Sequence, residues 1–348
     1  MIVIHIGMPK AGSTTLQQFL KANDEALREM SIDYPRAGRE HPTHNLNHRN
    51  FANGILERNR RILERSGSLD DIVRYLGDNE YASTILSSEE LFRAGEPAIR
   101  RAQALLAPIG REIRIILIIR DPRERLPSAY AQRVRFGVSA DDFDTFFKFR
   151  AVNDEVDQFK VAERWAKVFG WPAIRVRLLS PPALRGGDLI TDFLASAGLD
   201  PDAPELAALP RPPRANESPG WKTLEGVRAY FGGLSGLRDD HPLMRMESPD
   251  TPQKRKIFGF AAEAIGRELG WHEDKGLYLT DEQAALCADN HASTIQMLNE
   301  HLVELLPTSS GVEECEFVGR PFLPDVSKID GAELQAFYDG WSASLESQ

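Results

Sequence analysis

The chain has 348 residues, 42% of them hydrophobic, and a formal net charge of −10, so it is long enough to bury a large core. The negative net charge, together with the lack of a segment rich in Lys or Arg, argues against a nucleic-acid partner. Any anion-binding site must therefore depend on a few residues close to the ligand, since the overall charge does not attract anions. Its two cysteines, Cys287 and Cys315, lack the spacing of metal ligands and are too few for a disulfide scaffold, which points to a reducing compartment.

The chain starts directly with a strand-like run, IVIHI at residues 2–6. This start has neither the basic residues nor the apolar stretch and cleavage site of a signal peptide. The longest apolar run near the middle, at 115–119, is far too short to cross a bilayer. We therefore expect a cytoplasmic protein without a membrane span.

A turn that contains glycine follows the first strand, and a helix is predicted to open at Ser13, where apolar residues repeat at helical spacing. Residues 35–54 are polar and irregular. Further strands are predicted at 83–86, 113–119 and 173–179. The sequence IRIILII at 113–119 is typical of a central parallel strand that is buried on both faces. The helices predicted before residue 200 cover 55–66, 69–77, 97–107, 128–135, 154–169 and 188–197.

The carboxyl-terminal part begins with a loop rich in Pro and Ala at 200–220, and its last forty residues have little pattern. Helices are predicted at 220–231, 252–269 and 281–306. The alternation of helices and strands predicts an α/β fold with three layers, α/β/α, around a central parallel sheet. We expect a single domain over 1–348, with an α/β core at 1–200 and a mainly helical portion at 201–348.

The segment HIGMPKAGSTTLQ joins the first strand to the first helix. In this geometry, backbone amides and the amino end of a helix point at one spot, which suits phosphate or sulfate. Gly7 and Gly12 permit close backbone approach, and Lys10 adds a positive charge. A nucleotide-hydrolysing P-loop has lysine directly after its second glycine, whereas Ser13 occupies that position here and the lysine stands three residues earlier than that position.

A second motif follows the central strand, in IIRDPRERLPSAYAQRVRFG. Arg120 lies at the carboxyl end of a predicted parallel strand, where ligands bind in open α/β sheets. Ser128 follows eight residues later at the start of the next predicted helix. A guanidinium group together with a hydroxyl suits a phosphate monoester.

Both motifs resemble those of the sulfotransferases that use 3'-phosphoadenylyl sulfate (PAPS). The run Pro9-Lys10-Ala11-Gly12-Ser13-Thr14 resembles the family's 5'-phosphosulfate loop, and Arg120-Asp121-Pro122, Arg125 and Ser128-Ala129-Tyr130 resemble its 3'-phosphate motif. The resemblance covers about residues 1–200 and implies a P-loop-like sulfotransferase fold. It assigns the donor to the following residues: Lys10, Ala11, Gly12, Ser13, Thr14 and Thr15 at the 5' end, with Arg120 and Ser128 at the 3'-phosphate.

A third contact to the 3'-phosphate is left open by the resemblance. Arg214 lies in a loop where relatives often place one, but the chain lacks the Arg-Lys-Gly run of cytosolic small-molecule sulfotransferases. The resemblance implies transfer of a sulfuryl group to a hydroxyl or amine, with 3',5'-ADP (PAP) as product and no metal.

The base that takes the acceptor's proton has two candidates, since relatives use either histidine or glutamate. One lies in the loop with His41, His44 and His48, where we favour His44 because imidazole titrates near neutral pH. The other is Glu89, after the second predicted strand. As adjacent residues, Glu89 and Glu90 are not expected to face one site together.

The acceptor stays open between carbohydrate, lipid and small metabolite, and the oligomeric state is equally open. Two other functions compete with the sulfotransferase. One is a P-loop small-molecule kinase, which the position of Lys10 disfavours. The other is a non-catalytic nucleotide-binding protein of the same fold, which the presence of Lys10, Arg120 and Ser128 disfavours.

Overall fold

A computed structural model describes residues 1–39, 46–58, 67–152, 157–213, 219–246, 249–274, 276, 278–308 and 324–347. The chain forms two compact units. Unit 1 comprises Met1–Asp121, Asp154–Ala215 and Asp289–Val312, and unit 2 comprises Pro122–Asn153, Asn216–Ala288 and Glu313–Gln348. The expected single domain over 1–348 stays a prediction.

Unit 1 is built on one parallel sheet. Within the described residues this sheet has five strands in the order β2-β3-β1-β4-β5. Their bounds are Ile32–Asp33 (β2), Ser83–Ser88 (β3), Ile2–Ile6 (β1), Ile113–Ile119 (β4) and Ile174–Leu178 (β5). The strands β1 and β3 are buried along their whole length, as expected for a parallel sheet that is covered on both faces. The predicted α/β class is confirmed.

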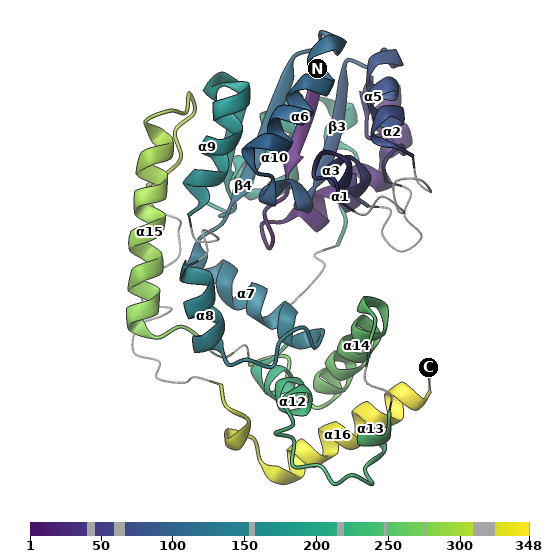
Figure 1. Cartoon of the computed structure of the whole chain (residues 1–348), viewed down its shortest axis with the longest axis vertical. Coiled ribbons are helices and arrows are strands. Elements are labelled where there is room, and N and C mark those ends of the chain that lie inside the picture. Colours follow the sequence, from purple (N-terminus) through teal and green to yellow (C-terminus); the bar gives the residue numbers. More distant parts are fainter. Residues whose placement is uncertain are drawn as a thin grey trace. The chain divides into compact units, whose positions relative to one another are not determined.

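Helices cover both faces of this sheet (Figure 1). The chain leaves β1 toward β2 on one side, whereas it leaves β3 and β4 toward the other side. Because such crossovers are right-handed, the helix after β1 lies on the opposite face from the helices before and after β4. The contacts agree with this rule, since α1 (Ser13–Ala22) packs on α10 (Leu189–Ser196), while α6 (Glu96–Leu106) packs on α9 (Gln158–Phe169).

The helices of unit 1 reproduce most of the predicted ranges. Helix α9 ends at Gly170, whose φ of 82° suits glycine as a stop. The predicted first helix is divided at Asn23, because its side chain bonds back to Phe19 O at 2.8 Å and α2 starts anew. The other α-helices described in this unit are α2 (Asp24–Glu29), α3 (Arg49–Ile55), α5 (Leu69–Asp78) and α11 (Pro204–Ala207). Its described 3-10 helices are η1 (Glu89–Arg93), η2 (Ala107–Ile109), η3 (Trp171–Ala173) and η4 (Arg185–Gly187).

Unit 2 is helical throughout its described part and has its own hydrophobic core, centred on Trp341, Phe337 and Tyr130. Its described helices are α7 (Pro122–Arg135), α8 (Phe143–Val152), α12 (Trp221–Phe231), α13 (Pro242–Arg245), α14 (Pro252–Glu268), the 3-10 helix η6 (Val326–Lys328) and α16 (Gly331–Glu346). Helix α15 (Asp281–Asn299) is divided between the two units.

Several predicted boundaries were wrong. The helix expected to start at Ser128 starts at Pro122 and continues through Pro127. A proline at the first helical position loses no hydrogen bond, which explains the earlier start. The segment 35–54 is not irregular throughout, since α3 starts at Arg49. The predicted helix over 281–306 ends earlier, at Asn299.

Candidate functional site

The loop between β1 and α1 has an unusual backbone. Gly12 has φ 81° and precedes the first residue of α1, and Lys10 has φ 67° although it carries a side chain. Within the loop, Ala11 N donates to Met8 O at 3.2 Å. Among the described residues no side chain caps α1, so the amino end of that helix meets the loop directly. This is the geometry that favours an anion.

At Gly7 and at Gly12 a larger residue would collide with neighbouring side chains, and these neighbours differ between the two positions. A Cβ atom on Gly12 would lie 2.4 Å from Leu189 Cδ2, and the positive φ adds a backbone cost for any other residue. A Cβ atom on Gly7 would lie 2.8 Å from Ser13 Oγ and 2.9 Å from Glu89 Cγ. Gly7 N also donates to Ser88 O at 3.1 Å. The loop is therefore packed closely between α10 and the end of β3.

Arg120 follows β4, the neighbour of β1 in the sheet. Its guanidinium Nη1 donates to the backbone oxygen of Lys10 at 3.1 Å. The structure thus brings together two segments that lie 110 residues apart in the sequence. Since the chain leaves β1 and β4 in opposite directions, their carboxyl ends form a topological switch point, the usual place for a ligand in such sheets.

The side-chain amide of Gln158, the first residue of α9, forms hydrogen bonds with both the backbone N–H and the backbone C=O of Arg120. Arg120 N donates to Gln158 Oε1 at 3.1 Å, and Gln158 Nε2 donates to Arg120 O at 2.8 Å. No pattern in the sequence distinguishes this glutamine. A lone Gln at the start of a helix carries no signal of its own, and its partner is known only once the sheet is assembled.

Glu89 lies beside the loop and is partly buried. Burial raises the pKa of its carboxyl group, and the nearby positive charge of Lys10 opposes that rise. Glu90 instead pairs with Arg49, at 3.3 Å between Oε1 and Nη2. Ser88 Oγ accepts a hydrogen bond from Glu90 N at the start of η1, so Glu89 is not needed as the cap of that helix.

His48 and His5 are buried in unit 1 and take structural roles. His48 Nδ1 accepts from Ser87 N at 3.1 Å, so its Nε2 donates to Pro35 O at 3.0 Å. His5 Nδ1 shares a hydrogen bond of 2.9 Å with Ser87 Oγ. Burial lowers the pKa of His5 to about 4 and that of His48 to about 3, so both imidazoles are neutral at pH 7. The predicted base His44 lies outside the described residues, as do His41 and Arg214.

Ser87 joins three parts of unit 1. Besides its bonds to His5 and His48, its Oγ accepts from Gln17 Nε2 on α1 at 3.0 Å. All four side chains are buried. This polar group ties the helix that follows the loop to the end of β3 and to the segment before α3.

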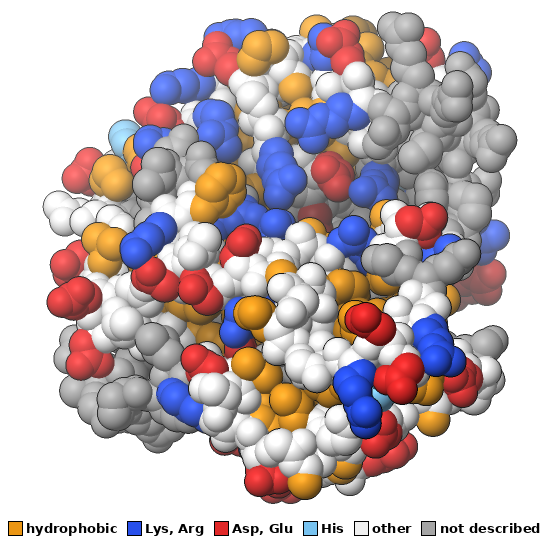
Figure 2. Space-filling view, turned by 60° about the horizontal axis from the view of Figure 1, so that its bottom comes forward, with side chains coloured by type: hydrophobic (Ala, Val, Ile, Leu, Met, Phe, Trp, Pro, Cys, Tyr) orange, Lys and Arg blue, Asp and Glu red, His pale blue; other side chains and the backbone are white. Residues whose placement is uncertain are grey.

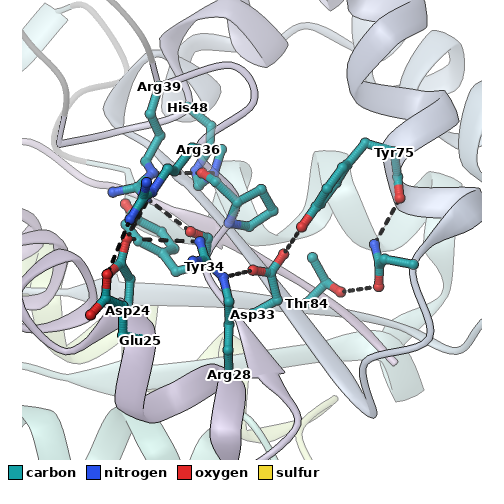
Figure 3. A network of polar contacts seen from close by, with 12 residues as sticks. Asp24, Glu25, Arg28, Asp33, Tyr34, Arg36, Arg39, His48, Tyr75 and Thr84 are labelled. Atoms are coloured by element: carbon teal, nitrogen blue, oxygen red, sulfur yellow. Dashed lines mark hydrogen bonds and ion pairs between the residues drawn. The ribbon is translucent and has the colours of Figure 1, made fainter.

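A larger polar network, drawn in Figure 3, holds residues 33–39 beside α2 and α5. Buried Asp33 on β2 accepts from Arg28 Nε at 3.0 Å and from Tyr75 Oη at 2.9 Å. Arg39, also buried, donates to Tyr34 O at 3.0 Å and lies over the ring of Tyr34. These bonds satisfy charges that would otherwise be costly to bury.

Ser128, the predicted partner of Arg120, lies on α7 in unit 2 and is half-buried. Its neighbour Tyr130 is buried and packs against Phe143, Phe146 and Tyr278. Arg125, the middle residue of the second motif, is fully buried. Of that motif, only Arg120 and Asp121 belong to unit 1.

The surface is mixed in charge. On the face drawn in Figure 2, Lys and Arg side chains are interspersed with Asp and Glu. In the part of the chain that the structure describes, His, Cys, Asp and Glu form no group of three or more that could hold a metal ion. No helix in the same part is both long and apolar enough to cross a membrane.

The chain matches no family model, no curated protein and no solved structure.

Proposed function

We propose that this chain is a PAPS-dependent sulfotransferase with a P-loop-like sulfotransferase fold. The observation that carries the proposal is the meeting of the Lys10 loop with Arg120 at the carboxyl ends of β1 and β4. The guanidinium group of Arg120, the backbone of Lys10 and the amino end of α1, which no side chain caps, lie together there in a chain whose net charge is −10. A doubly phosphorylated donor is the kind of ligand that such a site suits.

In the proposed complex, the amides and hydroxyls of the loop hold the phosphosulfate end of the donor. These groups belong to Ala11, Gly12, Ser13, Thr14 and Thr15. Thr14 and Thr15 are only partly buried at the start of α1. Arg120 is proposed for the 3'-phosphate, and the assignment of Ser128 and Arg214 to the same phosphate stays a prediction from the resemblance.

The transfer step is an in-line displacement. The acceptor oxygen or nitrogen forms a bond to sulfur while the bond between sulfur and the 5'-phosphate oxygen breaks, and 3',5'-ADP leaves. Lys10 donates a proton, or a hydrogen bond, to that oxygen as negative charge develops on it. No metal enters this step.

The acceptor's proton passes to a base, for which we now favour the carboxylate of Glu89. Its contact with Gly7 and its electrostatic coupling to Lys10 put it next to the group that assists the leaving oxygen. A carboxyl group whose pKa is raised by burial is a stronger base once ionised. His44 stays a candidate.

Ligand-dependent stabilisation provides the first test. With 3',5'-ADP at one hundred times its dissociation constant, the free energy of unfolding should rise by about 2.7 kcal/mol. Adenosine 5'-monophosphate, which lacks the 3'-phosphate, serves as the matched ligand, and ATP with Mg²⁺ tests the kinase alternative. Transfer from PAPS labelled with ³⁵S to acceptors in a cell extract then tests catalysis.

Absence of any shift with millimolar 3',5'-ADP would refute the proposal. Binding of 3',5'-ADP without transfer to any acceptor of a broad panel would favour the non-catalytic alternative. Turnover of ATP that depends on Mg²⁺ would favour the kinase.

A further inference from the structure

Gln158 is buried at the end of the sheet, where a glutamine is not needed for the helix that it begins. Its exposed fraction is 1%, and the cap of α9 is Asp157, whose carboxylate accepts from Lys160 N at 3.1 Å. The amide of Gln158 is therefore free of any capping duty, and it makes two hydrogen bonds to one backbone residue, Arg120.

These two hydrogen bonds continue the backbone pairing of β4 by one residue beyond its end at Ile119. The last pair in the β4–β5 register is Ile119 with Leu178, and Leu179 N donates to Ile119 O at 2.8 Å. A primary amide carries N–H donors and a carbonyl acceptor on the same carbon, so it can bond the C=O and the N–H of one residue at once. The Gln158 side chain thus takes the place of a neighbouring strand for the N–H and C=O of Arg120.

Fixing the backbone of Arg120 restricts the positions from which its side chain can reach the Lys10 loop. That group donates to Lys10 O at 3.1 Å, and Lys10 itself has an unfavourable positive φ of 67°. A strained backbone persists only where its surroundings hold it. The contacts form a chain that runs from Gln158 through Arg120 to the loop.

We propose that Gln158 is a positioning residue, which holds Arg120 so that Arg120 can hold the Lys10 loop and bind an anionic donor. The part of this inference that concerns the donor rests on the proposed function. The part that concerns the loop does not, so the two are tested separately.

Hydrogen exchange tests the loop in the full chain without any nucleotide. Gln158→Met keeps the volume of the side chain but removes both hydrogen bonds. In this variant we expect faster amide exchange in peptides that cover 117–121 and in those that cover 7–12. Arg120→Met should also accelerate amide exchange at 7–12. The matched control is Gln103→Met, because Gln103 bonds to Val168 O at the other end of α9 at 2.6 Å. It should leave 7–12 unchanged.

A double-mutant cycle tests the donor. Gln158→Met should weaken binding of 3',5'-ADP by about tenfold, the loss expected for one to two ordinary hydrogen bonds. In the Arg120→Met background the same substitution should cause no further loss, because Gln158 acts only through Arg120. A purely structural role would give additive losses.

Unchanged exchange at 7–12 in folded Gln158→Met would overturn the inference, and so would additive losses of affinity. If the wild-type chain does not bind 3',5'-ADP at all, the proposed function fails while the exchange experiment still decides the role of Gln158. Should Gln158→Met fail to fold, Gln158→Glu serves instead, because it keeps the shape and the acceptor for Arg120 N but loses the donor to Arg120 O. It should accelerate exchange at 7–12 less than at 117–121.

Discussion

Replacing Gly12 by alanine should destabilise unit 1 by an amount that the structure allows us to work out. Alanine at φ 81° costs about 1–2 kcal/mol, because an L-residue in the left-handed region crowds its own carbonyl. The added Cβ atom would also lie 2.4 Å from Leu189 Cδ2, and overpacking of this kind costs about 1–3 kcal/mol. The expected loss is therefore about 2–5 kcal/mol.

The two contributions can be separated with Leu189→Ala. In that background Gly12→Ala no longer meets the leucine, so only the backbone cost of about 1–2 kcal/mol should remain. Because the chain has two units, a global unfolding signal would mix their transitions. Urea-dependent hydrogen exchange of β1, which lies in the core of unit 1, reports on that unit alone. If Gly12→Ala stays within about 0.5 kcal/mol of the wild type, the size expected of a neutral surface substitution, our reading of this loop is wrong.

Three further changes test the site. Lys10→Ala should reduce sulfuryl transfer at least about a hundredfold, as loss of a charge-stabilising donor does, while the urea midpoint stays near that of the wild type. Glu89→Gln should raise the stability of unit 1 at pH 7, because burial raises the pKa of this carboxyl group above its ordinary 4.5. Between the unfolded and the folded pKa, the folded chain retains a proton that the unfolded chain has lost. The stability of the wild type therefore falls as pH rises through that range. The fall should be absent in Glu89→Gln and present in Glu90→Gln, measured by urea titrations between pH 4 and 8 that are followed by hydrogen exchange of β1. Ser87→Ala should cost about 2–3 kcal/mol in the same titrations, because it leaves a buried imidazole and a buried amide each without a partner.

Continuous apolar sequence made the sheet predictable. The run IRIILII predicted β4 at its observed bounds, because a strand that is buried on both faces needs no polar alternation. Strand β2, in contrast, was not predicted. It has only two residues, and one of them is Asp33, which can be buried only because Arg28 and Tyr75 supply its partners.

Helix boundaries were less predictable where local signals conflicted. The helix predicted over 128–135 starts at Pro122 as α7, because the first turn of a helix needs no N–H from proline. Pro127, by contrast, lies inside α7, where it removes one backbone donor. Helix α16 was not predicted although Phe337 and Trp341 lie four residues apart, a spacing that puts both on one buried face. That pattern could have been found.

The sequence singled out two basic residues of the candidate site, Lys10 and Arg120, but not the polar side chains that hold their segments in place. Lys10 and Arg120 stood out because their residue types and their places after strands carry chemical meaning. Gln158, Gln17 and Ser87 act through partners that are distant in the sequence, and no local pattern distinguishes such side chains from ordinary polar ones.

The positive φ of Lys10 has a consequence for which residues position 10 tolerates. The backbone there favours glycine, asparagine and aspartate on conformational grounds, while the proposed chemistry requires an ammonium group. A library of all twenty residues at this position, sorted once for yield of folded protein and once for donor binding, should therefore return two different preferred sets. Valine and isoleucine should be depleted from both, because branching at Cβ conflicts with that backbone whatever the side chain does.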